Sequence, residues 1–475
     1  MFTFMVIVFI VGYMFIALEH PVKIDKAASA LLIGVLTWVL FILDAQGILE
    51  MGFSRSWEHF QTSTVLTDYL ATTPNATLVD KMTYFITHHE ILHHLSEISA
   101  ILFFLLGAMT IVEVIDQHQG FKLITDRITT TSKVKLLWIL SILTFFMSAA
   151  LDNLTTTIVL VALIRKLIDD KHTRWFFSSM VVLAANAGGA WSPIGDVTTI
   201  MLWIGGQITA GHIIAHVVFP SLICMLVPLI IVSFKLKGNI TRPQLDENAN
   251  KDFTTSFERR LILIMGLACL LFVPVFKTIT HLPPYMGILF GLSIMWLATE
   301  VLHRNKRGED KRKLSVIGIL RKVDVPTVFF FMGILSAVAA LQSAGHLNLL
   351  SGFLDKIGNV YVIDLAIGVL SSIVDNVPLV AGAMGTYEVL TPEIANAAAN
   401  PEYASMFIKD GTFWEFLAYT AGTGGSVLII GSAAGVAAMG MEKIDFIWYM
   451  KRISILALIG YLAGAAAYWS QSLIF

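Results

Sequence analysis

The chain has 475 residues, of which 56% are hydrophobic and 14% are charged, and its mean hydropathy is +0.75. No water-soluble fold can bury this much apolar surface, so the composition predicts an all-α polytopic membrane protein. The formal net charge of -2 argues against a nucleic-acid partner. The two cysteines, Cys224 and Cys269, both lie inside apolar runs, which excludes a disulfide framework.

Three apolar runs open the chain, at residues 2–18, 26–43 and 97–116. Each is close to the length of about 20 residues that crosses a bilayer. The first run lacks a basic n-region and a small-residue cleavage site, so we expect a retained span and not a signal peptide. The polar, acidic segment 44–96 is expected to carry local helices in water. Residues 117–133 mix basic and apolar positions at helical spacing and predict an amphipathic helix at the interface.

A polar island interrupts the next apolar run. The sequence SAALDNLTTT places Asp152, Asn153 and Thr155 between two short apolar limbs. Residues 134–168 therefore predict a re-entrant helical hairpin, which enters and leaves the membrane on the same side. The following apolar segment, 176–205, contains NAGGAWSPIGDVTT, whose glycines and proline cannot sustain a continuous helix. This segment predicts a broken helix.

The second half of the chain repeats this order. A span at 212–235 closes the first repeat, residues 1–235, and a hydrophilic cytoplasmic linker covers 236–258. The elements predicted in the second repeat, 259–475, are spans at 259–276, 284–302 and 326–343, an amphipathic piece at 345–357, a hairpin at about 360–390, a broken helix at about 412–440 and a final run at 445–474. The sequence therefore predicts a tandem duplication.

Two motifs carry the repeat. The second hairpin contains SSIVDNVPLV, in which Asp375 and Asn376 repeat the first Asp-Asn pair. The second broken helix contains TAGTGGSVLIIGSAAG, which aligns with the first break through Ala-Gly and Ile-Gly-Asp/Ser with a short gap. Each repeat supplies three spans, one broken helix and one final span, so the number of crossings is odd and the repeats have inverted topology.

The basic residues test this topology independently. All but five of the 32 lysine and arginine residues fall on one side of the membrane; the exceptions are Arg55, Lys81, Lys277, Lys356 and Lys409. Basic loops stay in the cytoplasm. The pattern therefore predicts a multi-pass protein of the bacterial inner membrane with both termini in the periplasm. The first hairpin then enters from the cytoplasm and the second from outside.

The polar tips are predicted to bind an ion. A carboxylate inside the hydrocarbon region costs at least ~2.5 kcal/mol, so an acid there is a functional candidate. The two breaks, expected to be unwound over Asn186–Thr199 and Thr420–Ser432, would add further oxygen donors. The predicted ion-binding and proton-coupling residues are Asp152, Asn153, Thr155, Asn186, Asp196, Thr198, Thr199, Asp375, Asn376, Thr420, Thr423, Ser426 and Ser432.

Hard oxygen donors of this kind suit Na⁺ or Li⁺. Desolvation favours the protonated carboxyl and a bound cation favours the ionised form, so H⁺ and Na⁺ compete for one site, which is the basis of antiport. Asp196 has no acidic counterpart in the second break, where Ser432 takes its place. The alternative interpretation is that the Asp-Asn pairs only cap half-helices.

The Asp-Asn tips and broken helices resemble the NhaD-type Na⁺/H⁺ antiporters of the ion transporter superfamily. The motifs LDNLTTT, VDNVPL and TAGTGGS carry the resemblance, which covers nearly the whole chain. It implies a scaffold domain, a moving transport domain with both hairpins, a homodimer, no cofactor, and exchange of cytoplasmic Na⁺ or Li⁺ for external H⁺ in Na⁺ tolerance and pH homeostasis. Relatives that carry dicarboxylates have Ser-Asn-Thr at the tips, so Asp here disfavours an anionic substrate. Transport of arsenite or an organic anion remains the alternative.

A different class of function is suggested by HHEILHH. His89, Glu90 and His93 match HExxH, which on a helix places two imidazoles on one face for Zn²⁺. An intramembrane zinc metalloprotease is therefore a rival hypothesis, although the motif lies outside a central apolar helix and lacks an evident third ligand. The simpler interpretation is a histidine cluster in a wet external loop.

Histidine titrates near neutrality, so some of these side chains are candidates for pH sensing. The candidates are His88, His93, His94 and His212. Four further acids lie near predicted helix ends, where solvation or pairing with basic residues would explain them. They are Glu113, Glu300, Asp364 and Glu388.

Overall fold

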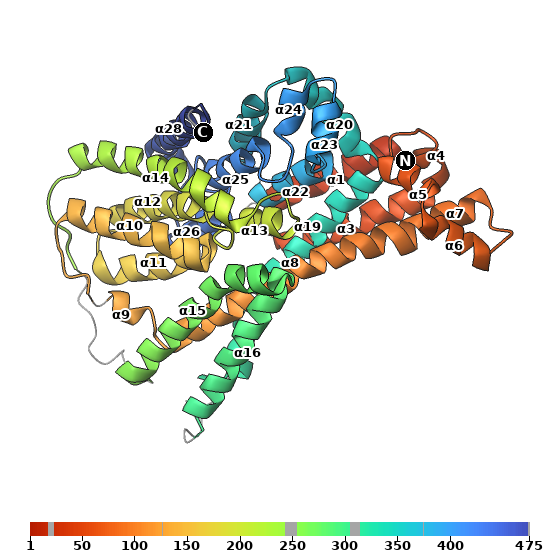
Figure 1. Cartoon of the computed structure of the whole chain (residues 1–475). Helices are drawn as coiled ribbons and strands as arrows, with labels where there is room; N and C mark the ends of the chain where they lie inside the picture. Colours follow the sequence, from red (N-terminus) through yellow and green to blue (C-terminus); the bar gives the residue numbers. More distant parts are fainter. Residues whose placement is uncertain (18–22, 126, 243–253, 305–313, 374, 474–475) are drawn as a thin grey trace. The chain divides into compact units, whose positions relative to one another are not determined.

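The computed structural model describes residues 1–17, 23–125, 127–242, 254–304, 314–373 and 375–473, and it is built from helices (Figure 1). Seven helices in this described part are long and apolar enough to cross a membrane, or eight if a bent pair counts as one span. The chain is therefore a polytopic membrane protein, as predicted. Most of the expected linker, 243–253, and the basic stretch 305–313 lie outside the described residues.

The helices of the first half follow the predicted order. They are α1 (Phe2–Ala17), α3 (Lys26–Leu43), α4 (Ala45–Leu49), α5 (Arg55–Gln61), α6 (Thr64–Thr72), α7 (Leu78–Tyr84), the π-helix η1 (Phe85–Glu90), α8 (Ile91–Gln117), α9 (Lys122–Thr125), α10 (Lys133–Leu151), α11 (Asn153–Leu167), α12 (Lys171–Ala190), α13 (Val197–Ile204) and α14 (Ala210–Lys235). The expected local helices between the second and third spans are present.

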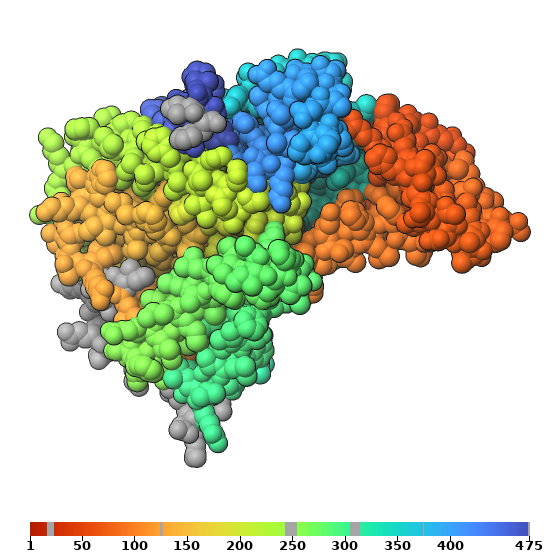
Figure 2. All heavy atoms as spheres, in the orientation of Figure 1, coloured from red at the N-terminus to blue at the C-terminus, as the bar shows by residue number. Residues whose placement is uncertain are grey.

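The helices of the second half also keep the expected order. They are α15 (Ser256–Thr280), α16 (Pro284–Leu302), α18 (Val316–Leu320), α19 (Val325–Ser343), α20 (His346–Leu354), the 3-10 helix η3 (Asp355–Ile357), α21 (Val360–Leu370), α22 (Asn376–Thr386), α23 (Pro392–Ala397), α24 (Pro401–Ser405), α25 (Thr412–Gly424), α26 (Ala433–Glu442), α27 (Phe446–Arg452) and α28 (Ser454–Ser472). The exposed side chains of α15 and α16, green in Figure 2, include Ile264, Leu271, Phe290 and Leu297, as expected of a membrane-embedded surface.

Four local expectations are wrong. The amphipathic helix expected at 117–133 is reduced to α9, because Gln119 has a positive φ of 57° that ends the preceding helix. The final run is two helices, α27 and α28, that meet at an angle of 52°. The histidine-rich loop is helical, because it continues from α7 through η1 into α8. The breaks are narrower than expected, which is described below.

Contacts divide the chain into two compact units. Unit 1 comprises Met1–Leu102, Val325–Ile363 and Val377–Phe407, and unit 2 comprises Phe103–Asp324, Asp364–Asn376 and Ile408–Phe475. Each unit draws on both halves of the sequence, so the units do not coincide with the two repeats.

In unit 1, α3 packs along α19 at a pair of glycines. A methyl group added at Gly34 would meet the backbone of Gly333, and one added at Gly333 would meet the backbone of Ala30 and Leu31. The absence of both side chains therefore lets the two helix backbones touch. Nearby, Phe41, Phe60 and other apolar side chains from α3 to η1 form a buried cluster.

In unit 2, a buried glutamate joins three helix ends through ion pairs with two arginines. The carboxylate of Glu442, at the end of α26, accepts hydrogen bonds from Arg165 Nε at 2.6 Å and Arg174 Nε at 3.0 Å. Arg165 lies in the last turn of α11, and Arg174 lies in the first turn of α12. Trp175 Nε1 also donates to the Glu442 carbonyl at 2.9 Å. This cluster ties the end of the first predicted hairpin to both broken helices.

The same contacts recur in two places of unit 2. Ser148 donates to the carbonyl of Ala185 at 2.6 Å, and Ser371 donates to the carbonyl of Ala421 at 2.9 Å. A methyl group at Gly188 would meet the carbonyl of Phe145, and one at Gly424 would meet the carbonyl of Gly368. In both cases an apolar limb passes directly against the end of a broken helix.

These contacts fix the register of the two breaks. Gly188 and Gly424 occupy equivalent places, with the same sequence separation as Asp196 and Ser432. The two breaks therefore align without the short gap that the sequence suggested.

Candidate functional site

The first polar tip is a single residue between two helices. Asp152 ends α10 and begins α11, with φ 93° and ψ 159°. Its carboxylate accepts the backbone N–H of Thr155 at 2.7 Å and the Thr155 hydroxyl at 2.8 Å. An Asp in this unusual conformation costs on the order of 1–3 kcal/mol, which is typical of functional sites. The tip therefore presents its acid at a helix N-terminus, as the capping interpretation also requires.

Asp196 is the centre of a buried polar network in this unit. Its side chain caps α13, where Oδ1 accepts the N–H and the hydroxyl of Thr198, each at 2.9 Å. Asn153 Nδ2, from the first tip, donates to Oδ2 at 2.6 Å. Asn376 Nδ2, from the second tip, lies 3.4 Å from each carboxylate oxygen. Both Asp-Asn tips thus meet at one acid of the first break.

Asn186 bridges the two breaks. Its Oδ1 accepts a hydrogen bond from Asn153 Nδ2 at 3.1 Å, and its Nδ2 donates to the hydroxyls of Ser426 at 2.8 Å and Ser432 at 2.9 Å. Ser432 in turn caps α26 by accepting the N–H of Gly435 at 3.1 Å. Residues from both tips and both breaks, all of them predicted from the sequence, therefore form one continuous buried network.

The breaks themselves are shorter than the sequence indicated. The first covers only residues 191–196, because α12 continues to Ala190 and α13 starts at Val197. The second covers residues 425–432. Asn186, Thr198 and Thr423 are therefore helical and not unwound, since glycine and proline stop a helix only at the positions where they stand.

Some predicted residues lie outside the Asp196 network. The hydroxyls of Thr199, Thr420 and Thr423 each donate to a backbone carbonyl three or four residues earlier. Asp375 is half-buried at the turn before α22, and it acts on Asp196 through its charge.

Asp196 is a buried acid without a counter-charge among the described residues. Its exposed fraction is 1%, and it forms no ion pair with any residue of the described ranges. Its hydrogen-bond partners are amides, hydroxyls and one backbone N–H, and the negative charges of Asp152 and Asp375 also act on it. A buried carboxylate without a counter-charge either takes up a proton or holds a cation, because an isolated charge is very costly in a low-dielectric interior.

Sequence reasoning missed one acid. Asp364 was expected to be solvated near a helix end, but it is 0% exposed on α21, and neither carboxylate oxygen has a hydrogen-bond partner in the described structure. The expectation failed because Asp364 lies on the buried face of this limb, next to the buried Ile363, whereas Val362 and Val369 are exposed. Its repeat equivalent, at the same separation as Asp152 and Asp375, is Ser141, which is also buried without a partner. An Asp inside a short apolar limb was the available signal.

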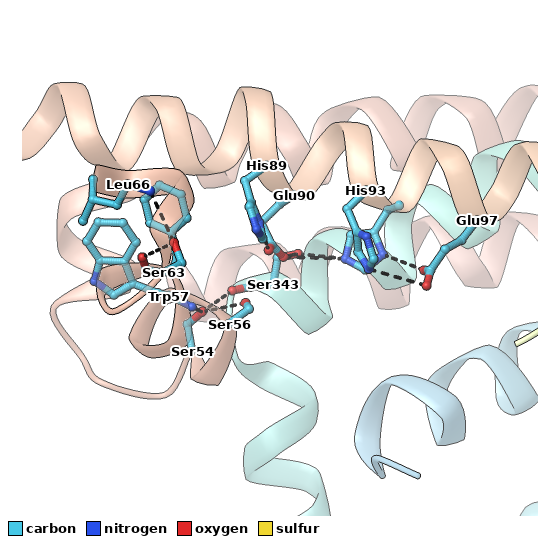
Figure 3. A network of polar contacts seen from close by, with 12 residues as sticks. Ser54, Ser56, Trp57, Ser63, Leu66, His89, Glu90, His93, Glu97 and Ser343 are labelled. Carbon is cyan, nitrogen blue, oxygen red and sulfur yellow. Dashed lines mark hydrogen bonds and ion pairs between the residues drawn. The ribbon is translucent and has the colours of Figure 1, made fainter. Parts of the chain in front are cut away.

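Unit 1 holds a second polar network (Figure 3). Glu90, in η1, is 3% exposed and accepts a hydrogen bond from the Ser343 hydroxyl. His94 Nε2 lies 3.6 Å from Glu90 and 3.2 Å from the Ser343 hydroxyl. Glu97 lies 3.5 Å from both His93 and His94. A cavity of about 310 Å³ opens beside this network and is lined by Arg55, His59 and Glu388 among others.

The HExxH residues do not assemble as a zinc site. His89 Nδ1 lies 3.1 Å from Glu90, whereas His93 is directed to Glu97. Among the described residues, one group of three His, Cys, Asp or Glu side chains has its ligand atoms within 4.8 Å of one another, and it is His212, His216 and Glu415. His88 is exposed and His94 is buried, so the four predicted pH sensors occupy different environments.

Comparison with known proteins adds independent evidence. The family described as "Citrate transporter" matches residues 13–408. The chain is 48% identical over 384 residues to "Sodium/proton antiporter 1" of Arabidopsis thaliana, covering 80% of this chain and 63% of that protein. It is 41% identical over 466 residues to "Sodium/proton antiporter 2" of the same plant, covering 98% of each. It is 30% identical over 393 residues to "Na(+)/H(+) antiporter NhaD" of Vibrio parahaemolyticus, covering 77% of this chain and 89% of that protein.

Proposed function

Because the chain belongs to the citrate transporter family and, within it, to the NhaD-type Na⁺/H⁺ antiporters, we propose that it exchanges cytoplasmic Na⁺ or Li⁺ for external H⁺ at the Asp196 network. The observation that carries this proposal is a fully buried carboxylate that makes no ion pair within the described chain. Such a group is neutralised either by H⁺ or by a small cation, and the two compete. The proposed role of the protein is in Na⁺ tolerance and pH homeostasis.

The residues around Asp196 have separate tasks. Asn153 and Asn376 donate from the two tips and hold the carboxylate in place. Asn186, Ser426 and Ser432 supply amide and hydroxyl oxygens. Cytoplasmic Na⁺ displaces the proton from Asp196, and on the external side a proton displaces Na⁺. Oxygen donors of this kind match an alkali cation.

The repeated contacts favour two inverted repeats with re-entrant hairpins. Ser148 and Ser371 make equivalent hydrogen bonds, as do the glycines that pack against each limb. Under this topology both termini lie on the external side of a cytoplasmic membrane, in agreement with the basic residues of the sequence. A homodimer, implied by the resemblance to the family, completes the proposed assembly.

The other hypotheses receive less support. An anion or arsenite carrier would place its substrate beside Asp152 and Asp196, which repel negative charge. A metalloprotease would need His89 and His93 on one metal, but these side chains contact different acids. The relatives reported above are named for sodium/proton exchange.

Asp364 is proposed to carry a second proton. It lies in the first limb of the second hairpin, enclosed and without a hydrogen-bond partner among the described residues. A carboxyl group of this kind is neutral when protonated and can release its proton only when the surrounding structure changes. It would thus add a titrating group that the first hairpin, with Ser141, lacks.

The decisive experiment uses everted membrane vesicles with an acid lumen and a fluorescent pH probe. We expect Na⁺ and Li⁺ to dequench the probe, and Asp152→Asn to weaken the response while the protein remains folded and inserted. An anion that exchanges in place of Na⁺ and Li⁺ would contradict the proposal. Unchanged exchange by Asp152→Asn would exclude the first tip from the mechanism.

A further inference from the structure

A second group of ligands lies away from the Asp196 network, on α14 and α25. His212 and His216 are one turn apart on α14, and Glu415 is in the first turn of α25. One ligand atom from each lies within 4.8 Å of the other two. Along α25, Glu415 is eight residues, or about 12 Å, from Thr423 at the edge of the second break.

The carboxylate of Glu415 is held in place by hydrogen bonds to only one of its two oxygens. The Glu415 side chain is 3% exposed. Its Oε2 lies 2.7 Å from His216 Nδ1 and accepts the Tyr468 hydroxyl at 3.1 Å. Its Oε1 makes no hydrogen bond within the described chain and lies 3.5 Å from His212 Nδ1. A buried carboxylate oxygen with no donor is a costly feature unless another ligand satisfies it.

The two imidazoles complete an accessible donor set. Their side chains are 53% and 37% exposed, so an ion can reach the site from solution. Zn²⁺ binds imidazole nitrogen and carboxylate oxygen at about 2.0–2.2 Å, which separates tetrahedral ligands by about 3.4 Å. The His212–Glu415 distance already matches this value. The His216–Glu415 pair is closer because a proton joins it, and a metal ion would replace that proton.

We propose that His212, His216 and Glu415 form a binding site for a divalent transition-metal ion of the Zn²⁺ class. Two nitrogens and one carboxylate suit a borderline-soft ion and not Na⁺, Ca²⁺ or Mg²⁺, which prefer oxygen donors alone. Tyr468, on α28, orients the carboxylate from behind. The bound ion links α14 to α25, and the fourth coordination position is left to water. The proposal does not depend on the exchange activity.

The test uses purified, tag-free, full-length protein in detergent, freed of metal with a chelator and titrated with Co²⁺. We expect visible absorption bands that saturate and that Zn²⁺ displaces. Glu415→Gln and the double substitution of His212 and His216 by Ala should remove one molar equivalent of bound Co²⁺. Tyr468→Phe should lower the affinity for this Co²⁺ ion by about tenfold. His172→Ala, which changes an exposed histidine on α12, is the control and should bind as the wild type does.

If the Glu415→Gln protein keeps the unfolding temperature and the Na⁺/H⁺ exchange of the wild type, its loss of Co²⁺ binding is not due to misfolding. Equal Co²⁺ stoichiometry and affinity in the wild type and in both ligand variants would overturn the proposal. Loss of the metal only when His93 and His94 are replaced would also overturn it, because the ion would then belong to α8.

Discussion

The two broken helices of unit 2 share a backbone arrangement but differ in their chemistry. In the first, Asp196 caps the second segment with a carboxylate, and in the second, Ser432 caps the equivalent segment with a hydroxyl. The first break has Asn186 in its last helical turn, whereas its equivalent in the second break is Gly422, which has no side chain. Of the two breaks, the first therefore carries both the carboxylate and the amide.

This difference bears on the proposed ion site. The first break supplies a carboxylate and the second supplies a hydroxyl at the equivalent position, so the proposed site combines an acid of one break with neutral oxygens of the other. The charges of Asp152 and Asp375 also act on Asp196. Like charges held close together repel each other, so a proton or an alkali cation bound there would relieve the repulsion.

The largest effect is expected at Asp196. Asp196→Asn keeps the shape and the cap of α13 but removes the charge, so Na⁺-dependent exchange should fall by more than about tenfold. The vesicle assay measures this directly, with Ser432→Ala as the matched control in the other break. If Asp196→Asn exchanges ions at the wild-type rate, the ion must bind at other residues.

The Asp364 and Ser141 positions offer a second comparison. Asp364→Ser makes the two limbs alike, removes an unsatisfied buried carboxyl, and should raise the free energy of unfolding by about 1–3 kcal/mol. Exchange should fall by about tenfold, since a proton carrier is lost. Thermal unfolding and transport are measured on the same preparation. Greater stability with unchanged exchange would show that Asp364 only destabilises the fold and takes no part in exchange.

The first tip should also contribute more to ion binding than the second tip. Asn153 donates to Asp196 at 2.6 Å, whereas Asn376 lies 3.4 Å from it. Asn153→Ala should therefore raise the Na⁺ KM by about tenfold, and Asn376→Ala by about threefold or less, because long hydrogen bonds are weak. Na⁺ dose-response curves of the two variants test this ranking. The reverse order would show that the second tip holds the ion.

The smallest effect is expected at Ser432. Ser432→Ala removes the cap of α26 and one acceptor for Asn186, so the free energy of unfolding should fall by about 1 kcal/mol. Exchange should stay within about threefold of the wild type, since Ser426 still accepts from Asn186. A loss as large as that of Asp196→Asn would mean that the two breaks contribute equally.

Sequence patterns were sufficient for the elements that depend on local chemistry. Apolar runs located α3, α16 and α19 to within a residue, and the Asp-Asn motifs located both tips. Glycine and proline located the breaks, although their length was overestimated because residues such as Asn186 tolerate a helix that tertiary packing supports. Helix caps such as Asp152 and Asp196 were visible as polar residues before apolar runs.

What the sequence could not supply depends on contacts between distant segments. The burial of Asp364 requires knowing which face of its limb packs against protein, and the link from Asn186 to Ser426 and Ser432 joins residues far apart in the chain. The histidines of α8 looked like a loop because their polarity outweighed their helical continuity. His216 and Glu415 were overlooked, since only folding places α14 beside α25.

The ion pair at Glu442 has a mechanical consequence. The Glu442 side chain is buried and carries a negative charge that Arg165 and Arg174 offset, so these two ion pairs hold the ends of α11, α12 and α26 together. Trp175 adds a hydrogen bond to the Glu442 carbonyl, so three side chains anchor one helix end. Any movement of α11 relative to α12 and α26 would have to break these contacts first, so the three helix ends are expected to move together.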